Sequence, residues 1–449
     1  MKKIYSFALT AVAIAAVGCS REELPLTPAT SQEDIPVVPA HMRSLDEALN
    51  EAQGIISAMS VEDDTRSTKA RTVKSVELIT NGAVTRSAES DTVLYLVNYK
   101  EGGFAILGRP KLSHPLYAFS DEGSFSMADT VGSPVGLFIH DAILNASIAA
   151  EEAADLITPI GPGILPPILN YSYSVCRQVK PMLPKHVSRW HQDDPYNAFA
   201  PELPRDFDHG ELVGRHIAKG VVGCVPLSAG QLMAYYKWPK RLPPVYAEDA
   251  YSAPLNWDEM TTGSDNRAVA YFLEILAGRA FYGAYYRNDE NDEDTVLGDL
   301  RCASALDNKE VFKRIGYSVT SCFDRLDFSR SLRREQVLEF MSGKNASEAT
   351  PVAPVLVSSK WIGYEDKSGH QWVMDGYVEY DKVSIRDPNT ILGQDLFLHC
   401  IWGECDSSVH GYYLYYPSEN SLSGTSYEGV DYGYRAPSLY IYGRYTVEE

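Results

Sequence analysis

The chain has 449 residues, of which 45% are hydrophobic and 22% charged, so it has enough apolar side chain for a buried core, which excludes wholesale disorder. Its formal net charge is −20, from 60 acidic and 40 basic residues, and a field of that sign repels phosphate backbones and excludes nucleic acid as an expected partner. The length allows two or three domains, since one domain usually takes about 100–200 residues.

Residues 1–18 have the features of a signal peptide. Two lysines precede the apolar run 7–17, which is too short to cross about 30 Å of hydrocarbon. The run ends in AVGC, which resembles the lipobox of bacterial lipoproteins, where the cysteine, here Cys19, is lipidated and becomes the mature N-terminus. An ordinary signal peptide, cut with loss of Cys19, is the alternative. We therefore expect an exported lipoprotein of the cell envelope, held at the outer membrane or the cell surface by its lipid.

The next part of the chain predicts a small α+β unit after a Pro- and Thr-rich spacer. Apolar residues recur at helical spacing over 44–60, with Ser44 as the cap. Strand patterns at 93–99 and 104–107 flank the sequence KEGG, which is a hairpin signal. A Pro- and Gly-rich stretch at 157–169 then marks a connection.

The second half of the chain has a different pattern of predicted secondary structure. A helix-rich stretch, roughly 224–345, precedes a strand-rich stretch that runs from residue 352 to the end. Within the latter, the pair Asp375-Gly376 separates two apolar runs and predicts a two-residue hairpin turn.

Cys224 follows a glycine and opens a helical pattern. At a helix N-terminus the dipole and the free N–H groups favour thiolate and lower a thiol pKa to about 3.5–7.5. Pro226 fits such a helix only in its first turn. Considered alone, a cysteine in this position is more often an inert small hydrophobe.

Two further residues have the chemistry to assist a thiol. His370 begins the first strand of the predicted hairpin, from which its ring can face a helix packed across the sheet. Gln192 lies in a WHQD string, where its amide can donate to a developing oxyanion and supplement the N–H of Cys224. Each has a plain alternative, as a structural histidine or a surface glutamine.

Taken in order, the strings around these residues resemble the streptopain family of papain-like cysteine peptidases. The matching strings are the oxyanion glutamine segment WHQDDPYN (190–197), the nucleophile helix GCV (223–225) with AGQLMAY (229–235), the histidine strand GHQWVMDGY (369–377) and the late tryptophan segment HCIWG (399–403). The resemblance covers about 190–416 and is specific, because four ordered strings agree. Strings at 95–99, 103–107 and 116–125 are similar to the propeptide of that family.

The resemblance implies an α+β fold, a papain-like two-subdomain peptidase with a helical half and an antiparallel β half, preceded by a small α+β pro-domain. It implies a cysteine endopeptidase in which Cys224 attacks the peptide carbonyl, His370 transfers the proton, and Gln192 helps to hold the oxyanion. Trp402 would pack beside the imidazole. No cofactor is implied, the substrates are proteins or peptides, and the pro-domain is an intramolecular inhibitor.

The domain plan that follows is a signal peptide at 1–18, a lipidated linker at 19–40, a pro-domain at 41–165 and a catalytic domain at 176–449. We expect processing between about 150 and 185.

Some positions depart from the family pattern and leave other functions open. Ile401 stands where the family usually has Asn, so a polar partner for the imidazole is missing, and Pro226 replaces a small residue. The sequence ECD at 404–406 replaces a second Trp and glycines. A transglutaminase-like acyl transferase and an inactive, surface-anchored binding protein on the same scaffold are the alternatives.

The seven cysteines include no CxxC pair and no metal-like Cys/His spacing, which argues against a structural zinc site. Bridges between Cys302 and Cys322, or between Cys400 and Cys405, stay open.

Overall fold

The computed structural model describes residues 38–58, 71–80, 92–127, 134–157, 171–200, 220–242, 254–278, 285–286, 301–302, 308–320, 353–360, 369–403, 409–415, 440–441 and 444–447. Residues from Pro39 onward form one compact unit. The predicted signal peptide and Cys19 lie outside the described residues.

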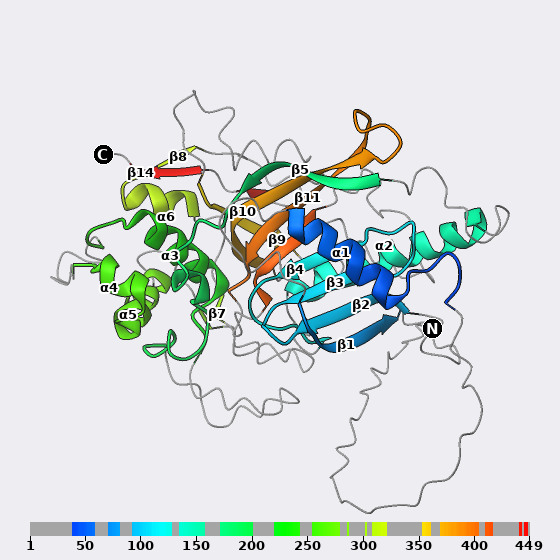
Figure 1. The fold of residues 1–449 in the computed structure, drawn as a ribbon. Helices are drawn as coiled ribbons and strands as arrows, with labels where there is room; N and C mark the ends of the chain where they lie inside the picture. Colours follow the sequence, from blue (N-terminus) through cyan, green and yellow to red (C-terminus); the bar gives the residue numbers. More distant parts are fainter. Residues whose placement is uncertain are drawn as a thin grey trace, which may run out of the picture. The chain divides into compact units, whose positions relative to one another are not determined.

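Helices and strands both contribute to this unit (Figure 1). The described helices are α1 (Leu45–Ala58), α2 (Pro134–Ile157), η3 (Val187–Arg189, 3-10), α3 (Cys224–Tyr236), α4 (Trp257–Thr262), α5 (Asn266–Ala277) and α6 (Asn308–Arg314). The described strands are β1 (Val73–Thr80), β2 (Thr92–Tyr99), β3 (Phe104–Gly108), β4 (Leu116–Ser120), β5 (Tyr171–Val179), β6 (Tyr285–Tyr286), β7 (Arg301–Cys302), β8 (Tyr317–Thr320), β9 (Val355–Lys360), β10 (Gly369–Ser384), β11 (Ile391–Ile401), β12 (Gly411–Tyr415), β13 (Tyr440–Ile441) and β14 (Arg444–Val447).

Ten of the described strands form one antiparallel sheet in the order β1-β2-β3-β4-β12-β11-β10-β9-β13, with β5 paired to β10 beside this path. Helix α3 packs against β9 and β10, and α1 packs against β3 and β5. The predicted α+β class, with a helical half and an antiparallel β half, is confirmed. None of the helices in the described parts of the chain is long and apolar enough to span a membrane.

The local signals of the N-terminal part form the expected elements. Ser44 caps α1, because its Oγ accepts from the Glu47 N–H at 3.2 Å while the Glu47 carboxylate accepts from the Ser44 N–H at 2.7 Å. The predicted hairpin joins β2 and β3. Its turn requires glycine at 103, where φ is 91° and a Cβ would lie 2.3 Å from the Ser120 carbonyl oxygen.

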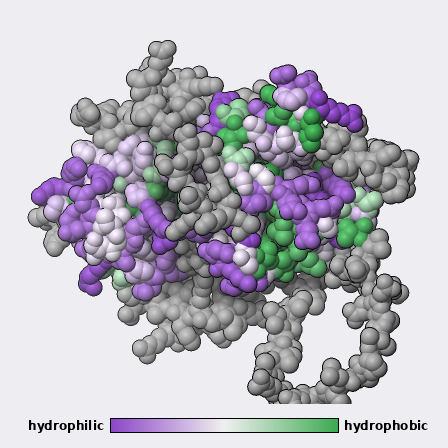
Figure 2. Space-filling view, viewed as in Figure 1, coloured by the Kyte–Doolittle hydropathy of each residue, from purple (hydrophilic) through white to green (hydrophobic). Residues whose placement is uncertain are grey.

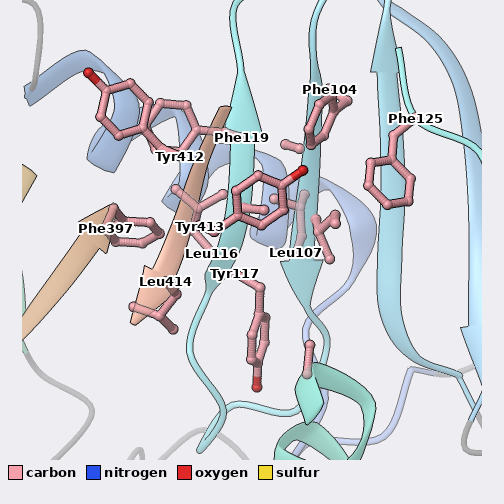
Figure 3. Close-up of a cluster of buried hydrophobic side chains, with 14 of the residues drawn as sticks. Phe104, Leu107, Leu116, Tyr117, Phe119, Phe125, Phe397, Tyr412, Tyr413 and Leu414 are labelled. Carbon is pink, nitrogen blue, oxygen red and sulfur yellow. The ribbon is translucent and has the colours of Figure 1, made fainter. Parts of the chain in front are cut away.

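The N-terminal strands and the C-terminal strands belong to the same sheet, because β4 pairs with β12. Phe119 of β4 stacks on Tyr412 of β12 with ring centroids 5.0 Å apart and meets Phe397 of β11 edge to face at 5.9 Å. Figure 3 shows this row of aromatic side chains across the junction. One buried core therefore runs from β2 to β11 and stabilises the junction by removing apolar surface from water.

A second core lies among the helices. Side chains of α3, α5 and α6 form it together with Leu356 of β9, Val373 of β10 and Ile401 of β11. Their strand neighbours Val355 and Trp372 face the first core. This alternation follows from the two-residue period of a strand. It places α3, α5 and α6 against one face of these strands and the N-terminal unit, defined as the described part of residues 39–157, against the other.

The predicted hairpin turn at Asp375-Gly376 is wrong. β10 continues as one strand from Gly369 to Ser384. The chain passes this point with a register shift against β11 between Met374 and Gly376, which is a bulge and not a reversal.

Tertiary contacts explain why the turn signal at this pair is overridden. The Asp375 carboxylate is buried and accepts from the N–H groups of Met182 and Leu183 at 3.0 and 2.9 Å, and from His399 Nδ1 at 2.6 Å. A Cβ at Gly376 would lie 2.9 Å from the Val179 carbonyl oxygen. Asp375 thus binds β10 to the segment that follows β5, and only glycine at 376 lets the two backbones come this close.

Exposed apolar side chains of the described surface include Leu78 on the edge strand β1, and Ile385, Ile391 and Leu392 at the turn between β10 and β11. Figure 2 shows apolar surface over β1, whereas the solvent-facing side of α1 is hydrophilic. The polar face of α1 agrees with its amphipathic sequence, whose Ala48, Ala52, Ile55 and Ile56 are buried.

Candidate active site

Cys224 is the first residue of α3, as the sequence predicts, and its side chain is partly exposed. Gly223 precedes the helix with φ 92° and ψ 141°, a conformation that is essentially confined to glycine. Pro226 lies in the first turn, where its missing N–H removes no helical hydrogen bond. The positive end of the helix dipole therefore acts on the sulfur and favours the thiolate.

His370 is the second residue of β10 and is buried, with 8% of its surface exposed. Its Nε2 lies 2.7 Å from the carbonyl oxygen of Trp402. A carbonyl can only accept, so Nε2 carries a proton, and the acceptor lone pair of the neutral ring is on Nδ1. Nδ1 is thus the nitrogen that can act as a base.

A buried polar contact ties the start of β10 to the start of α3. Gln371, the residue after His370, donates from Nε2 to Ser228 Oγ at 2.8 Å and to the Val225 carbonyl at 3.4 Å. Ser228 Oγ in turn donates to the Cys224 carbonyl at 2.7 Å. Residues adjacent to the two predicted catalytic residues are therefore in direct contact. The pairing of Cys224 Sγ with the His370 ring itself stays a prediction.

Gln192 is held next to the segment that enters α3. Its carbonyl oxygen accepts from the Val222 N–H at 2.9 Å, two residues before Cys224. The same loop is fixed from α3, where Gln231 Nε2 donates to the carbonyl of Trp190 at 3.2 Å. The backbone of Gln192 is thus close to Cys224, and the role of its side chain at an oxyanion stays a prediction.

The ring that stacks on His370 is that of Trp372, with centroids 6.2 Å apart and planes 15° apart. Trp402, which the resemblance places beside the imidazole, packs its indole on Trp372 at 4.9 Å. Its backbone N–H donates to His410 Nδ1 at 3.3 Å. Trp402 therefore contacts the imidazole through its carbonyl oxygen, whereas its indole is separated from the imidazole by the ring of Trp372.

Ile401, where the family pattern has a polar residue, is buried in the helical core with 1% exposed. The polar partner that its side chain cannot provide is supplied by the backbone, since the Trp402 carbonyl accepts from His370. The string ECD at 404–406 lies outside the described residues.

The structure adds three residues that the sequence did not single out. Gln371 and Ser228 join β10 to α3, and Trp372 stacks on the imidazole. Asp375, which the sequence assigns to a turn, instead holds β10 against Met182 and Leu183. Two signals were available in the sequence: a polar residue next to the candidate histidine, and a hydroxyl one helical turn after the candidate cysteine. Neither is distinctive in a sequence.

Other cysteines in the described parts are separate from this site. Cys400, one half of a considered bridge, is a free, buried thiol, and burial raises its pKa. Cys176 is free and exposed. Cys322 and Cys405 lie outside the described residues, and no group of His, Cys, Asp or Glu within those residues is placed to hold a metal ion.

This chain is similar to a family model and to several known proteins. The model of the Peptidase C10 family matches residues 190–413. Streptopain of Streptococcus pyogenes is 25% identical over 355 residues, which cover 73% of this chain and 79% of that protein. Among solved structures, a prointerpain A fragment of Prevotella intermedia has a TM-score of 0.40 at 16% identity, covering 76% and 91% of the two chains. Active interpain A of the same species has a TM-score of 0.32 at 17% identity, covering 56% and 89%.

Proposed function

Because residues 190–413 belong to the Peptidase C10 family, we propose that this protein is a cysteine endopeptidase that cleaves proteins through a Cys224–His370 dyad. The observation that carries the proposal is the contact of Gln371 with Ser228 and Val225. It links the residue after the histidine to the first turn of the helix that Cys224 begins, although the two segments are far apart in the sequence.

In the proposed reaction, the Cys224 thiolate attacks the carbonyl carbon of the scissile bond. His370, protonated at Nδ1, gives this proton to the leaving amine, and a thioester forms. Water then attacks the thioester while Nδ1 takes its proton, and the thiolate leaves. The bond from Nε2 to the Trp402 carbonyl keeps the ring oriented.

The oxyanion would be held by the N–H of Cys224 and the side-chain amide of Gln192. One well-placed donor of this kind contributes about 2.7–4 kcal/mol to the activation free energy. The bond between the Gln192 carbonyl and the Val222 N–H supports this role, because it holds the glutamine beside the head of α3.

We further propose that residues 41–165 form a pro-domain that inhibits the enzyme. Two contacts support this. β4 pairs with β12, and Glu122, which follows β4, forms ion pairs with Lys185 and with Arg189. Arg189 directly precedes the loop that contains Gln192, so the N-terminal unit is fastened next to the proposed oxyanion site.

Removal of this unit requires a cut between about 150 and 185. β5 occupies 171–179 of that window and is paired along its length with β10, which protects its backbone from a protease that binds extended, unpaired chain. We expect the new N-terminus outside β5. Mass spectrometry of the mature chain checks this, and a product that begins within 171–179 contradicts it.

The activity itself is tested by incubating an unstructured protein such as casein with the wild-type chain and with Cys224→Ala. We expect new N-termini from the wild type and none from the variant. Release of ammonia without new N-termini would instead indicate an acyl transferase. Intact casein with both proteins, under reducing conditions and after removal of the pro-domain, would favour the inactive binding protein.

We also propose that Cys19 is lipidated and anchors the exported protein in the cell envelope. The sequence AVGC after a short apolar run supports this. Metabolic labelling with radioactive palmitate should mark the wild-type protein but not Cys19→Ser, and equal labelling of both would contradict it.

A further inference from the structure

A two-link hydrogen-bond chain connects β10 to the backbone of Cys224. Gln371 Nε2 donates to Ser228 Oγ at 2.8 Å, and Ser228 Oγ donates to the Cys224 carbonyl at 2.7 Å. Both side chains are buried, with 1% and 2% of their surfaces exposed. The chain has one direction, because a serine hydroxyl can accept from the amide and donate its single proton to a carbonyl.

This chain is a polar contact within an interface that is otherwise apolar. Around it, α3 meets the sheet through Leu356, Val373 and Ile401 of the helical core. Apolar burial is non-directional and allows a helix to slide or rotate on a sheet, whereas hydrogen bonds fix distance and angle. A buried polar group costs free energy unless it is hydrogen-bonded. The bonds of Gln371 and Ser228 therefore fix the position of α3 on the sheet more precisely than apolar contacts alone would.

The two ends of the chain are adjacent to the proposed dyad. Gln371 follows His370 in β10, and successive strand side chains point to opposite faces, so the bond to α3 fixes the strand from the face opposite the His370 ring. The ring shares its face with Trp372, with which it stacks, and does not face α3 across the sheet as the sequence predicts. Ser228 lies one helical turn after Cys224 and binds its carbonyl.

From this arrangement we infer that Gln371 and Ser228 are positioning residues, which set the placement of the Cys224 sulfur relative to the His370 ring. The inference rests on the proposed function and deepens it. It explains how a peptidase site can be maintained although Ile401 contributes only apolar contact. Gln371 aligns β10 with α3, and the Trp402 carbonyl orients the His370 ring.

The test measures the pKa of the Cys224 thiol in the full chain. The rate of alkylation by iodoacetamide is followed from pH 4 to 10, and mass spectrometry quantifies the peptide that contains Cys224. Gln371→Met keeps the size of the side chain and removes its donors, and Ser228→Ala removes the hydroxyl. A matched control is Thr261→Ala, since Thr261 is also buried and its Oγ1 bonds the Trp257 carbonyl one turn earlier in α4.

We expect Gln371→Met and Ser228→Ala to raise the apparent thiol pKa by about one unit, which lowers the alkylation rate below that pKa about tenfold. In peptide hydrolysis by the processed protein, from which the proposed pro-domain has been removed, kcat should fall by a similar factor with KM within about twofold. Thr261→Ala should leave the thiol titration unchanged. A wild-type titration curve in both variants would overturn the inference, as would an equal shift in the control.

The result separates this inference from the proposed function. If the wild-type thiol titrates at the ordinary value near 8.5 and casein stays intact, the dyad itself is absent. If the wild-type thiol is acidic and both variants match it, the dyad stands and only the positioning role is lost. If Gln371→Met does not fold, the smaller change Ser228→Ala decides the question alone.

Discussion

His370 Nε2 donates to the carbonyl oxygen of Trp402 at 2.7 Å, so the acceptor lone pair of the neutral ring lies on Nδ1. In the proposed reaction, this is the nitrogen that takes the proton from the thiol or from water. His399 is the opposite case, because its Nδ1 donates to the buried carboxylate of Asp375 at 2.6 Å. The two rings therefore hold their protons on different nitrogens, for the same physical reason.

This contrast can be measured. In Cys224→Ala, which removes the thiol, ¹⁵N NMR of histidine-labelled protein above pH 8 should show His370 protonated at Nε2. His399 should be protonated at Nδ1 and serves as the internal reference. The signals are assigned by comparison with His370→Gln and His399→Gln. A proton on His370 Nδ1 would contradict the proposed direction of proton transfer.

The sequence selects Cys224 and His370 as candidates, because both residues stand in strings that recur as a set in one family. Their action as a dyad stays a prediction. The sequence was not sufficient to predict how the imidazole is oriented. Ile401 indicates that the imidazole lacks a side-chain hydrogen-bond partner, and the carbonyl of Trp402 takes that place. Every residue has a backbone carbonyl, so the sequence alone cannot predict this contact.

At the scale of elements, the start of α3 depends on the backbone of Gly223. Its φ of 92° and ψ of 141° cost an L-residue about 1–3 kcal/mol, and any relaxation would move the adjacent Cys224. The sharp entry into the helix is what presents the thiol at the N-terminal end of the dipole.

Gly223→Ala should therefore lower the free energy of unfolding by about 1–3 kcal/mol and raise the Cys224 thiol pKa. Gly54→Ala is the matched control, since Gly54 lies inside α1 and an added Cβ meets no atom within 4 Å. It should stabilise the protein by up to about 1 kcal/mol. Urea unfolding measures both, and equal stability of Gly223→Ala and wild type would contradict the account.

Elements with local signals were predicted well, and elements governed by distant contacts were not. Ser44 capped α1 because both partners of the capping box lie within four residues. The turn signal of Asp375-Gly376 is equally local, but bonds from Met182, Leu183 and His399 hold it in a bulge of β10. Those partners are far away in the sequence, so a local pattern could not reveal them.

At the scale of the molecule, Asp395 of β11 connects parts that lie far apart along the chain. Its carboxylate, with 5% exposed, contacts Lys382 at 2.9 Å, His114 of the N-terminal unit at 3.4 Å and the Tyr173 hydroxyl at 3.0 Å. Burial raises its pKa, but the hydrogen bond and charge of His114, with Lys382, outweigh burial and hold the pKa well below its usual range.

The sign of the resulting pH dependence follows from this shift. A carboxyl with a lowered pKa in the folded state stabilises the protein above its unfolded pKa, near 4, and this contribution is lost as the pH falls through the folded pKa. Asp395→Asn should therefore reduce the free energy of unfolding at pH 7 by about 3–5 kcal/mol. The difference from wild type should shrink below about pH 4 in urea unfolding, and a difference that does not vary with pH would contradict this assignment.

The joining of β4 to β12 is the feature of the whole molecule that the sequence did not predict. Each strand has a clear apolar pattern, but pairing between edges so far apart has no local sequence signal. It is fixed by the row of aromatic side chains that the fold brings together at Phe119, Phe397 and Tyr412.

In the proposed function, Cys224 and His370 act as one reactive pair. An epoxide that alkylates active-site thiols, applied to the mature protein and followed by peptide mapping, tests it most directly. We expect one equivalent of label on Cys224, and a labelling rate in His370→Ala that is lower by about 100-fold or more. Labelling that His370→Ala leaves unchanged, or label that falls on Cys176 or Cys400 in place of Cys224, would contradict the claim.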